Sequence, residues 1–210
     1  VAVKHLARAD AKILGVFGAG VQARAQVAAI RVVRDIEQVK VFDVVPEAAD
    51  KFVNDLRGDG VNASVVDSSE EAVVGSDIVT TATTSKEPII EGAWLEPGIH
   101  INGVGANSPG KKELAPSVYA RGHVVVDYKE QVLMEAGDLM AAIESGEFSE
   151  ADIAGELGEV IAGTKPGRNS DDAITVFKSV GVAYQDIATA AYVYRKAVDR
   201  GMGEEIDLKG

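Results

Sequence analysis

The chain has 210 residues, 46% of them apolar and 26% charged, a composition typical of a folded globular protein with one large or two small domains. Its 21 basic and 33 acidic residues give a formal charge of −12, which disfavours nucleic acid or an anionic membrane surface as a partner and favours a small molecule or another protein. The sequence has no cysteine, no apolar run long enough to span a membrane and no signal-peptide layout, so we expect a cytoplasmic protein without disulfides or thiol chemistry.

Short apolar runs that predict strands alternate with amphipathic stretches that predict helices. Residues 1–8 look like the end of a helix whose beginning lies upstream. The expected strands are 12–17, 39–42, 61–66, 77–81, 98–101 and 123–127, and the first helices are 21–34 and 46–56. Most of the strands are continuous β-branched runs, as in parallel strands covered on both faces. The pattern predicts an α/β fold with a doubly wound, mostly parallel sheet of the Rossmann type.

The pattern becomes mainly helical after Tyr128. Helices are predicted at 129–145 and 154–162, followed by a polar loop at 163–170. A short apolar run at 173–177 leads into a long helix from about 181 to 200, and the last ten residues are expected to form a loosely held tail.

A glycine-rich turn between the first strand and the next helix has the pattern G-x-G-x-x-A. Gly18 permits a tight turn, Gly20 lets the backbone approach a diphosphate, and Ala23 keeps the helix close to the strand. Asp43 ends the second strand, where a carboxylate would bind both ribose hydroxyls and repel a 2′-phosphate. The motif therefore predicts NAD rather than NADP, against the alternative of an ordinary α/β turn with a surface aspartate.

Two further strand ends are expected to line the same crevice, because ligands of open α/β sheets lie beyond the carboxyl ends of the strands. Thr80–Thr84 ends the fourth strand, and a glycine-rich loop at 101–111 follows the next one. Local capping is an equal alternative for the threonines, and turn geometry is an alternative for the glycines.

These residues resemble the ornithine cyclodeaminase/mu-crystallin family. The matching stretches run in order along nearly the whole chain, at 15–23, 77–83, 97–102, 108–114, 155–163 and 175–181. Within the family, the segment Lys40-Val-Phe-Asp-Val44 is most similar to the archaeal-type alanine dehydrogenases. The resemblance implies an NAD-binding domain at 1–175. It also implies a C-terminal helix and tail at 176–210 that pack on a substrate and dimerisation domain outside this chain, and a homodimer.

The resemblance also implies a set of site residues. Val21 and Gln22 match the pair that contacts the diphosphate, and Val180 matches a residue that closes the site over the nicotinamide and the substrate. The implied cofactor-binding residues are Gly18, Gly20, Val21, Gln22, Asp43, Thr83, Ile101, Asn102, Gly103, Val104, Lys111 and Ser179.

The chain departs from the family pattern in two respects. Cyclodeaminases carry an aspartate where this chain has Asn107, which cannot accept a proton at neutral pH but could orient an amine or a water. An asparagine at this catalytic position, Asn107, therefore weakens the case for cyclodeamination more than the case for hydride transfer. In addition, the family's substrate-binding arginine and lysine lie upstream of the matching region, so this chain is expected to lack them.

The predicted function is that of an NAD-dependent oxidoreductase acting on a small α-amino acid, with alanine the best single substrate. Hydride would leave Cα for the nicotinamide, and the imine would hydrolyse to pyruvate and ammonia; the reverse reaction would be imine reduction. One alternative is an ornithine cyclodeaminase that forms proline. Another is a mu-crystallin-like protein that binds a dinucleotide and a small ligand without important turnover.

Several residues are interpreted as structural. His100 is expected to be a hydrogen-bonded core or interface histidine, with a place near the substrate as the alternative, and His123 is expected to be structural. The three scattered histidines do not have metal-ligand spacing, so no metal is predicted. The charged residues of 129–145 are expected to form a solvated helix face, and the tyrosines of the last helix are expected to be packing residues; they are Glu130, Glu135 and Asp138, and Tyr184, Tyr192 and Tyr194.

Overall fold

The strands of the computed structural model, which describes residues 1–204 and 206, form one parallel sheet of eight strands in the order β3-β2-β1-β4-β5-β8-β6-β7. In chain order they are β1 (Ile13–Phe17), β2 (Gln38–Phe42), β3 (Ala63–Val65), β4 (Ile78–Thr81), β5 (His100–Gly103), β6 (His123–Val126), β7 (Gly155–Glu156) and β8 (Thr175–Lys178). The doubly wound α/β prediction is confirmed, and every strand pair is parallel.

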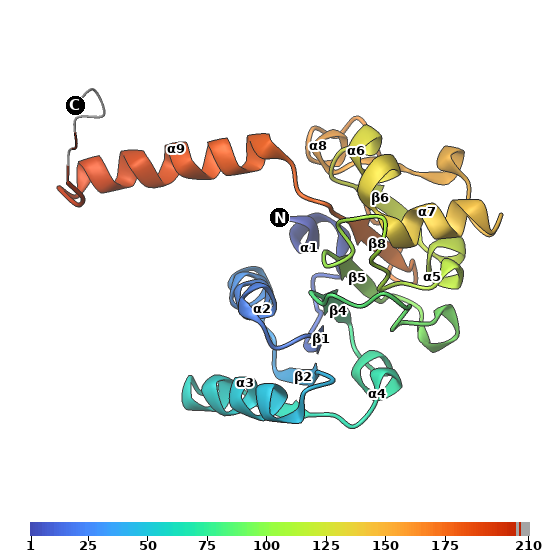
Figure 1. Cartoon of the computed structure of the whole chain (residues 1–210), viewed down its shortest axis with the longest axis horizontal. Coiled ribbons are helices and arrows are strands. Elements are labelled where there is room, and N and C mark those ends of the chain that lie inside the picture. Colours follow the sequence, from blue (N-terminus) through green and yellow to red (C-terminus); the bar gives the residue numbers. More distant parts are fainter. Residues whose placement is uncertain (205, 207–210) are drawn as a thin grey trace. The chain divides into compact units, whose positions relative to one another are not determined.

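Helices cover both faces of this sheet (Figure 1). One face packs against α1 (Ala2–Leu6), α2 (Val21–Val33), α3 (Pro46–Gly58) and α8 (Leu157–Ile161). The other face packs against α4 (Ser69–Val73), η1 (Gly92–Trp94), α5 (Pro116–Arg121), α6 (Lys129–Glu135) and α7 (Gly137–Glu144). The short turn η2 (Glu150–Asp152) precedes β7. Because both faces are buried, the strands read as continuous apolar runs.

Alternation along each strand divides the core into its two layers. On β1, Phe17 faces the α5–α7 side, whereas Leu14 and Val16 pack with α2 and α3. On β5, Ile101 packs on the same side as Phe17, with α5–α7. His100 and Asn102 point to the opposite face, since residues two apart share a face. The ladder places Val16, Thr80 and Asn102 side by side across β1, β4 and β5.

The connections reverse direction between β1 and β4. From β1 the chain moves outward through β2 to β3, then returns to pair β4 on the other side of β1 and continues to β5. The loops that leave β1 and β4 therefore diverge and open a crevice at the carboxyl edge of the sheet. This is where the sequence places the glycine-rich turn.

Two guanidinium groups hold α1 at the opposite edge. Arg34 donates to the carbonyls of Val3 and Ala7 at 2.8 and 3.0 Å, and Arg168 donates to the carbonyl of Leu6 at 2.8 Å. Cations at a helix C-terminus satisfy its free carbonyls. An ion pair between Arg8 and Asp77 adds a further link, because Asp77 also accepts from the amides that begin β1.

Several boundaries differ from the sequence prediction. The chain divides into two compact units, Val1–Val180 and Gly181–Gly210, so the expected boundary after residue 175 falls inside β8. The helix expected at 129–145 is two helices, and the helix expected at 154–162 begins as β7 before α8. The short helices α4 and α5 were not predicted.

The second unit contains α9 (Ala183–Asp199), which matches the long helix expected there. Its tyrosines Tyr184, Tyr192 and Tyr194 are exposed, so their expected role as packing residues stays a prediction. The predicted tail includes residues 205 and 207–210, which lie outside the described residues.

Candidate functional site

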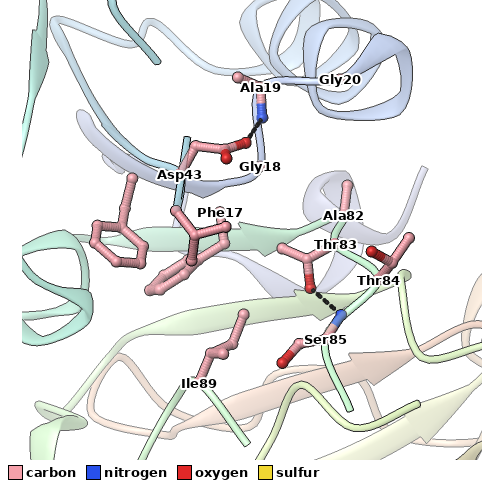
Figure 2. A pocket seen from close by; sticks show the side chains of 12 residues that line it. Phe17, Gly18, Ala19, Gly20, Asp43, Ala82, Thr83, Thr84, Ser85 and Ile89 are labelled. Carbon is pink, nitrogen blue, oxygen red and sulfur yellow. Dashed lines mark hydrogen bonds between the residues drawn. The ribbon is translucent and has the colours of Figure 1, made fainter. Parts of the chain in front are cut away.

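A cavity of about 310 Å³ lies at the carboxyl edge of the sheet, where β1, β2 and β4 end (Figure 2). Its wall comes from three segments: the turn after β1, the residues that end β2, and the loop after β4. The lining residues are Phe17, Gly18, Ala19, Gly20, Phe42, Asp43, Val44, Ala82, Thr83, Thr84, Ser85 and Ile89. The structure therefore brings together Gly18, Gly20, Asp43 and Thr83, four of the predicted cofactor-binding residues.

The glycine-rich turn needs its glycines for two different reasons. Gly18 has φ of +98°, and a Cβ on it would lie 2.7 Å from the carbonyl oxygen of Ala82. Gly20 has an ordinary φ of −75°, and a Cβ on it would meet no heavy atom within 4 Å. Gly18 thus serves the fold, whereas the absent side chain of Gly20 leaves open space beside the cavity.

The N-terminus of α2 adjoins this open space. Gly20 is the N-cap, no side chain caps the helix, and the first helical bond runs from the amide of Arg24 to the carbonyl of Gly20. The first-turn N–H groups of Val21 and Gln22 therefore lack intrahelical acceptors, and they lie at the positive end of the helix dipole. Both side chains are exposed. Such a terminus binds anionic groups, above all phosphates.

Asp43 joins β2 to the glycine-rich turn. Its Oδ2 accepts from the amide of Ala19 at 2.8 Å (Figure 2). Its Oδ1 accepts from the amide of Val45 at 2.9 Å. A carboxylate offers about four acceptor positions. Two therefore remain for hydroxyl groups of a bound molecule, on a side chain that two backbone amides already orient.

The loop after β4 is held by a buried carboxylate that the sequence did not indicate. The Thr83 hydroxyl donates to Glu113 Oε1 at 2.8 Å. It also accepts from the amide of Ser85 at 3.2 Å (Figure 2). The Thr83 side chain thus has a defined orientation beside the cavity, and its partner Glu113 is fully buried. Glu113 follows two lysines in a segment that reads as a polar loop, so no local signal marks it as buried.

The β5 segment predicted beside the nicotinamide ends at the same edge but does not line this cavity. Ile101 is fully buried in the core, Asn102 and Gly103 are buried, and Val104 is half-buried. Asn102 Oδ1 lies 3.1 Å from His100 Nε2, and Asn102 Nδ2 is a buried atom without a hydrogen-bond partner. The role of this segment as a cofactor contact stays a prediction.

His100 is a core residue, as expected. It is fully buried, and its ring nitrogens lie 2.9 Å from Thr175 Oγ1 and 3.1 Å from Asn102 Oδ1. Burial lowers the pKa of His100 to about 3, and the charges of Arg168 and Arg34 act in the same direction. His123 is also structural, with Nε2 3.2 Å from the carbonyl oxygen of Pro166.

The remaining predicted site residues form two local contacts. Lys111 Nζ donates to Asn107 Oδ1 at 2.9 Å, on an exposed loop. Asp127 Oδ2, at the end of β6, accepts from Ser179 Oγ at 2.8 Å and from the amide of Val180 at 2.9 Å. Asp127 was not predicted as part of the site, and it orients the segment that the family resemblance places over the nicotinamide.

The interpretation of Asp138 as part of a solvated helix face is wrong. Asp138 and Lys178 are both fully buried and form an ion pair, with Lys178 Nζ 3.1 Å from Asp138 Oδ1. Asp138 lies in the first turn of α7 and also accepts from the amide of Leu139. Its partner comes from the end of β8, far along the chain, which is why a local pattern of charges misplaced it.

The described part of the chain contains no helix with both the length and the apolarity that a bilayer span requires. Within the same residues, no three His, Cys, Asp or Glu side chains are grouped as a metal site would require. The cavity thus combines an uncapped helix N-terminus, a carboxylate and apolar walls, features that suit a small anionic molecule.

Comparison with known proteins assigns this arrangement to a family. The model of the ornithine cyclodeaminase/mu-crystallin family matches residues 1–201. An alanine dehydrogenase from Archaeoglobus fulgidus is 40% identical over 206 residues, which are 98% of this chain and 63% of that protein.

Two solved structures share the fold. The Δ1-pyrroline-2-carboxylate reductase of Thermococcus litoralis, in complex with NADH and L-proline, has a TM-score of 0.94 and 43% identity and covers 98% of this chain. An archaeal alanine dehydrogenase dimer with bound NAD has a TM-score of 0.92 and 41% identity and covers 99%. The chain spans 64% of the length of each of these two proteins.

Proposed function

The chain belongs to the ornithine cyclodeaminase/mu-crystallin family, and from this premise we propose that it binds NAD(H) for an oxidoreductase that interconverts a small amino acid and the corresponding imine or 2-oxo acid. The observation that carries the proposal is the open position at Gly20, which adjoins the uncapped N-terminus of α2 and lines the same cavity as Asp43. Two relatives of known structure hold NADH or NAD.

The residues present fit a dinucleotide. The space that a side chain at residue 20 would occupy suits a diphosphate, which the first-turn amides of Val21 and Gln22 would bind. The two free acceptor positions of Asp43 suit the two hydroxyls of a ribose. Among the described residues that line the cavity there is no lysine or arginine to bind a 2′-phosphate, which supports NAD over NADP.

NAD supplies the hydride acceptor, and NADH the hydride donor. The tasks left to the chain are to hold the coenzyme, orient the substrate beside it and exclude water. Thr83, Ser179 and Val180 are candidates for holding the coenzyme and excluding water. The buried carboxylate of Glu113 already orients the Thr83 side chain, and that of Asp127 orients the Ser179 side chain and the Val180 amide. Asn107 can orient an amine or a water but cannot serve as a base.

Alanine is the first candidate substrate, in keeping with the alanine dehydrogenases among the relatives. A cyclic imino acid is the second, because the pyrroline-2-carboxylate reductase solved with L-proline is 43% identical to this chain, slightly above the 40% and 41% of the two alanine dehydrogenases. Ornithine cyclodeamination is less favoured because Asn107 replaces an acid-base group. A homodimer is part of the proposal, supported by the dimeric archaeal relative.

Turnover assays separate the candidates. NADH absorbance is followed with alanine and NAD, with ornithine and NAD, and with Δ1-pyrroline-2-carboxylate and NADH. In a protein that joins this chain to the expected substrate-binding arginine and lysine, the proposal expects turnover with the first or the last pair, and weaker turnover when NADP(H) replaces NAD(H). Tight NADH binding by that protein without turnover of any pair would favour a binding protein, and absence of NADH binding to the chain itself would refute the proposal.

A further inference from the structure

The carboxylate of Glu113 lies at the centre of a hydrogen-bond cluster just behind the cavity. It is fully buried and accepts five hydrogen bonds from the end of β4 and from the loops after β4 and β5. Oε1 accepts from the amide of Thr83 at 2.7 Å and from its hydroxyl at 2.8 Å. Oε2 accepts from the hydroxyl of Thr81 at 2.7 Å, and from the amides of Gly105 and Ala106 at 2.7 and 3.1 Å.

These donors come from the ends of two neighbouring strands. Thr81 and Thr83 belong to the end of β4 and the loop that lines the cavity, whereas Gly105 and Ala106 belong to the loop after β5 that leads to Asn107. The main chains of the two loops are close there, because a Cβ on Gly105 would lie 2.5 Å from the carbonyl oxygen of Thr83 and 2.3 Å from Glu113 Oε1. One side chain thus ties the cavity wall to the Asn107 loop.

The backbone around Glu113 is itself held by hydrogen bonds to other elements. The amides of Glu113 and Leu114 donate to Asp138 Oδ2 at 3.3 Å each, and the carbonyl of Glu113 accepts from the amide of Ile89 at 2.8 Å. Asp138 is held in turn by its buried ion pair with Lys178. Glu113 therefore cannot shift without breaking contacts on both its backbone and its side chain.

We propose that Glu113 is a positioning residue for the site. It fixes Thr83, in the loop that lines the cavity, relative to the Gly105–Asn107 loop, so that the two loops keep the same relative position when the coenzyme binds. The proposal rests on the proposed function of the chain as an NAD(H)-binding protein. Glu113 does not line the cavity, so its effect on binding passes through Thr83 and the loop amides.

The variant Glu113→Gln tests this role, with Thr81→Val as its matched control. The glutamine side chain would turn an NH2 group toward two or three of the five donors, in either orientation of its amide. Thr81→Val removes one hydrogen bond to the same buried carboxylate but leaves its contacts with Thr83, Gly105 and Ala106. Binding of NADH to the 210-residue chain is measured by calorimetry, and stability by urea unfolding.

The expected result is an NADH Kd raised at least about tenfold by Glu113→Gln and less than about twofold by Thr81→Val, even where the two variants lose similar stability. Equal effects of both variants, or an unchanged Kd in Glu113→Gln, would overturn the positioning role and leave the proposed function standing. Failure of the unaltered chain to bind NADH would overturn the proposed function and this inference together.

Hydrogen exchange on the unaltered chain decides the matter if Glu113→Gln does not fold. The probe is ADP, which carries the half of the coenzyme that the cavity would hold. Its binding is expected to slow exchange at the amides of Gly105 and Ala106, outside the cavity, together with that of Thr83. Slower exchange at Thr83 alone would contradict the coupling through Glu113.

Discussion

Replacing Lys178 by methionine removes one charge of a fully buried ion pair while keeping a side chain of similar length. Lys178 and Asp138 are both 0% exposed, and Nζ lies 3.1 Å from Oδ1. Removing one partner of a buried pair leaves an uncompensated charge and typically costs about 3–5 kcal/mol. Asp138 keeps the amides of Glu113, Leu114 and Leu139 as donors, so we expect a loss of about 3 kcal/mol, at the lower end of that range.

Urea unfolding followed by the fluorescence of Trp94, which packs against the core, measures this loss. The double variant Lys178→Met/Asp138→Asn leaves no charge at either position of this pair and should be more stable than the single one. Lys129→Met is the matched control, because its pair with Glu150 is solvent-exposed and should contribute less than about 1 kcal/mol. A loss for Lys178→Met no larger than for Lys129→Met would refute the assignment of Asp138 to the core.

Two further predictions concern His100 and Asp43. The unfolded chain protonates His100 below about pH 6.5, whereas the native imidazole, with its pKa lowered to about 3 by burial, stays neutral. The free energy of unfolding should therefore fall as pH falls below 6.5, by about 2 kcal/mol at pH 5, and His100→Gln should flatten this dependence in urea unfolding at several pH values. Asp43→Ala should weaken NADH binding and reduce the preference for NADH over NADPH in parallel titrations; unchanged affinities for both would rule out the ribose-binding role.

Elements whose structure is determined by residues adjacent in the sequence could be predicted, with boundaries correct to within a residue or two. The strand at 12–17, the glycine turn and the helix at 21–34 correspond to β1, the turn and α2, because apolar period, turn glycines and helix start all lie within one short segment. Asp43 and Thr83 could be placed in the site for a similar reason: Asp43 directly follows β2, Thr83 lies two residues after β4, and parallel strands end at one edge.

Elements shaped by contacts between distant segments could not be predicted. The helix expected at 129–145 is interrupted at Ala136, and Gly137 there packs closely on another loop, since its Cβ would lie 2.4 Å from the carbonyl oxygen of Lys111. The strand β7 has two residues, too few for a periodic signal. Neither the helix interruption nor the short strand can be recognised in the local pattern of apolar and polar residues.

The buried polar residues behind the site were missed for the same reason. Glu113 follows two lysines, Asp138 lies in a stretch interpreted as a solvated helix face, and Lys178 follows a short apolar run. Each becomes a core residue only through partners from other elements. Burial of charge requires such partners. A sequence pattern shows the charge without its partner, so it predicts exposure.

Titration of NADH into the unaltered chain and into Gly20→Val tests the central claim most directly. A Cβ at residue 20 meets no atom of the protein within 4 Å, and its φ of −75° is ordinary, so Gly20→Val should fold and lose no more than the roughly 1 kcal/mol of a weaker N-cap. A Cβ at residue 58 also meets open space, so Gly58→Val is the control. We predict a heat of binding for the unaltered chain and for Gly58→Val, and none for Gly20→Val. Equal NADH binding by Gly20→Val, or no binding by the folded unaltered chain, would contradict a diphosphate site at the N-terminus of α2.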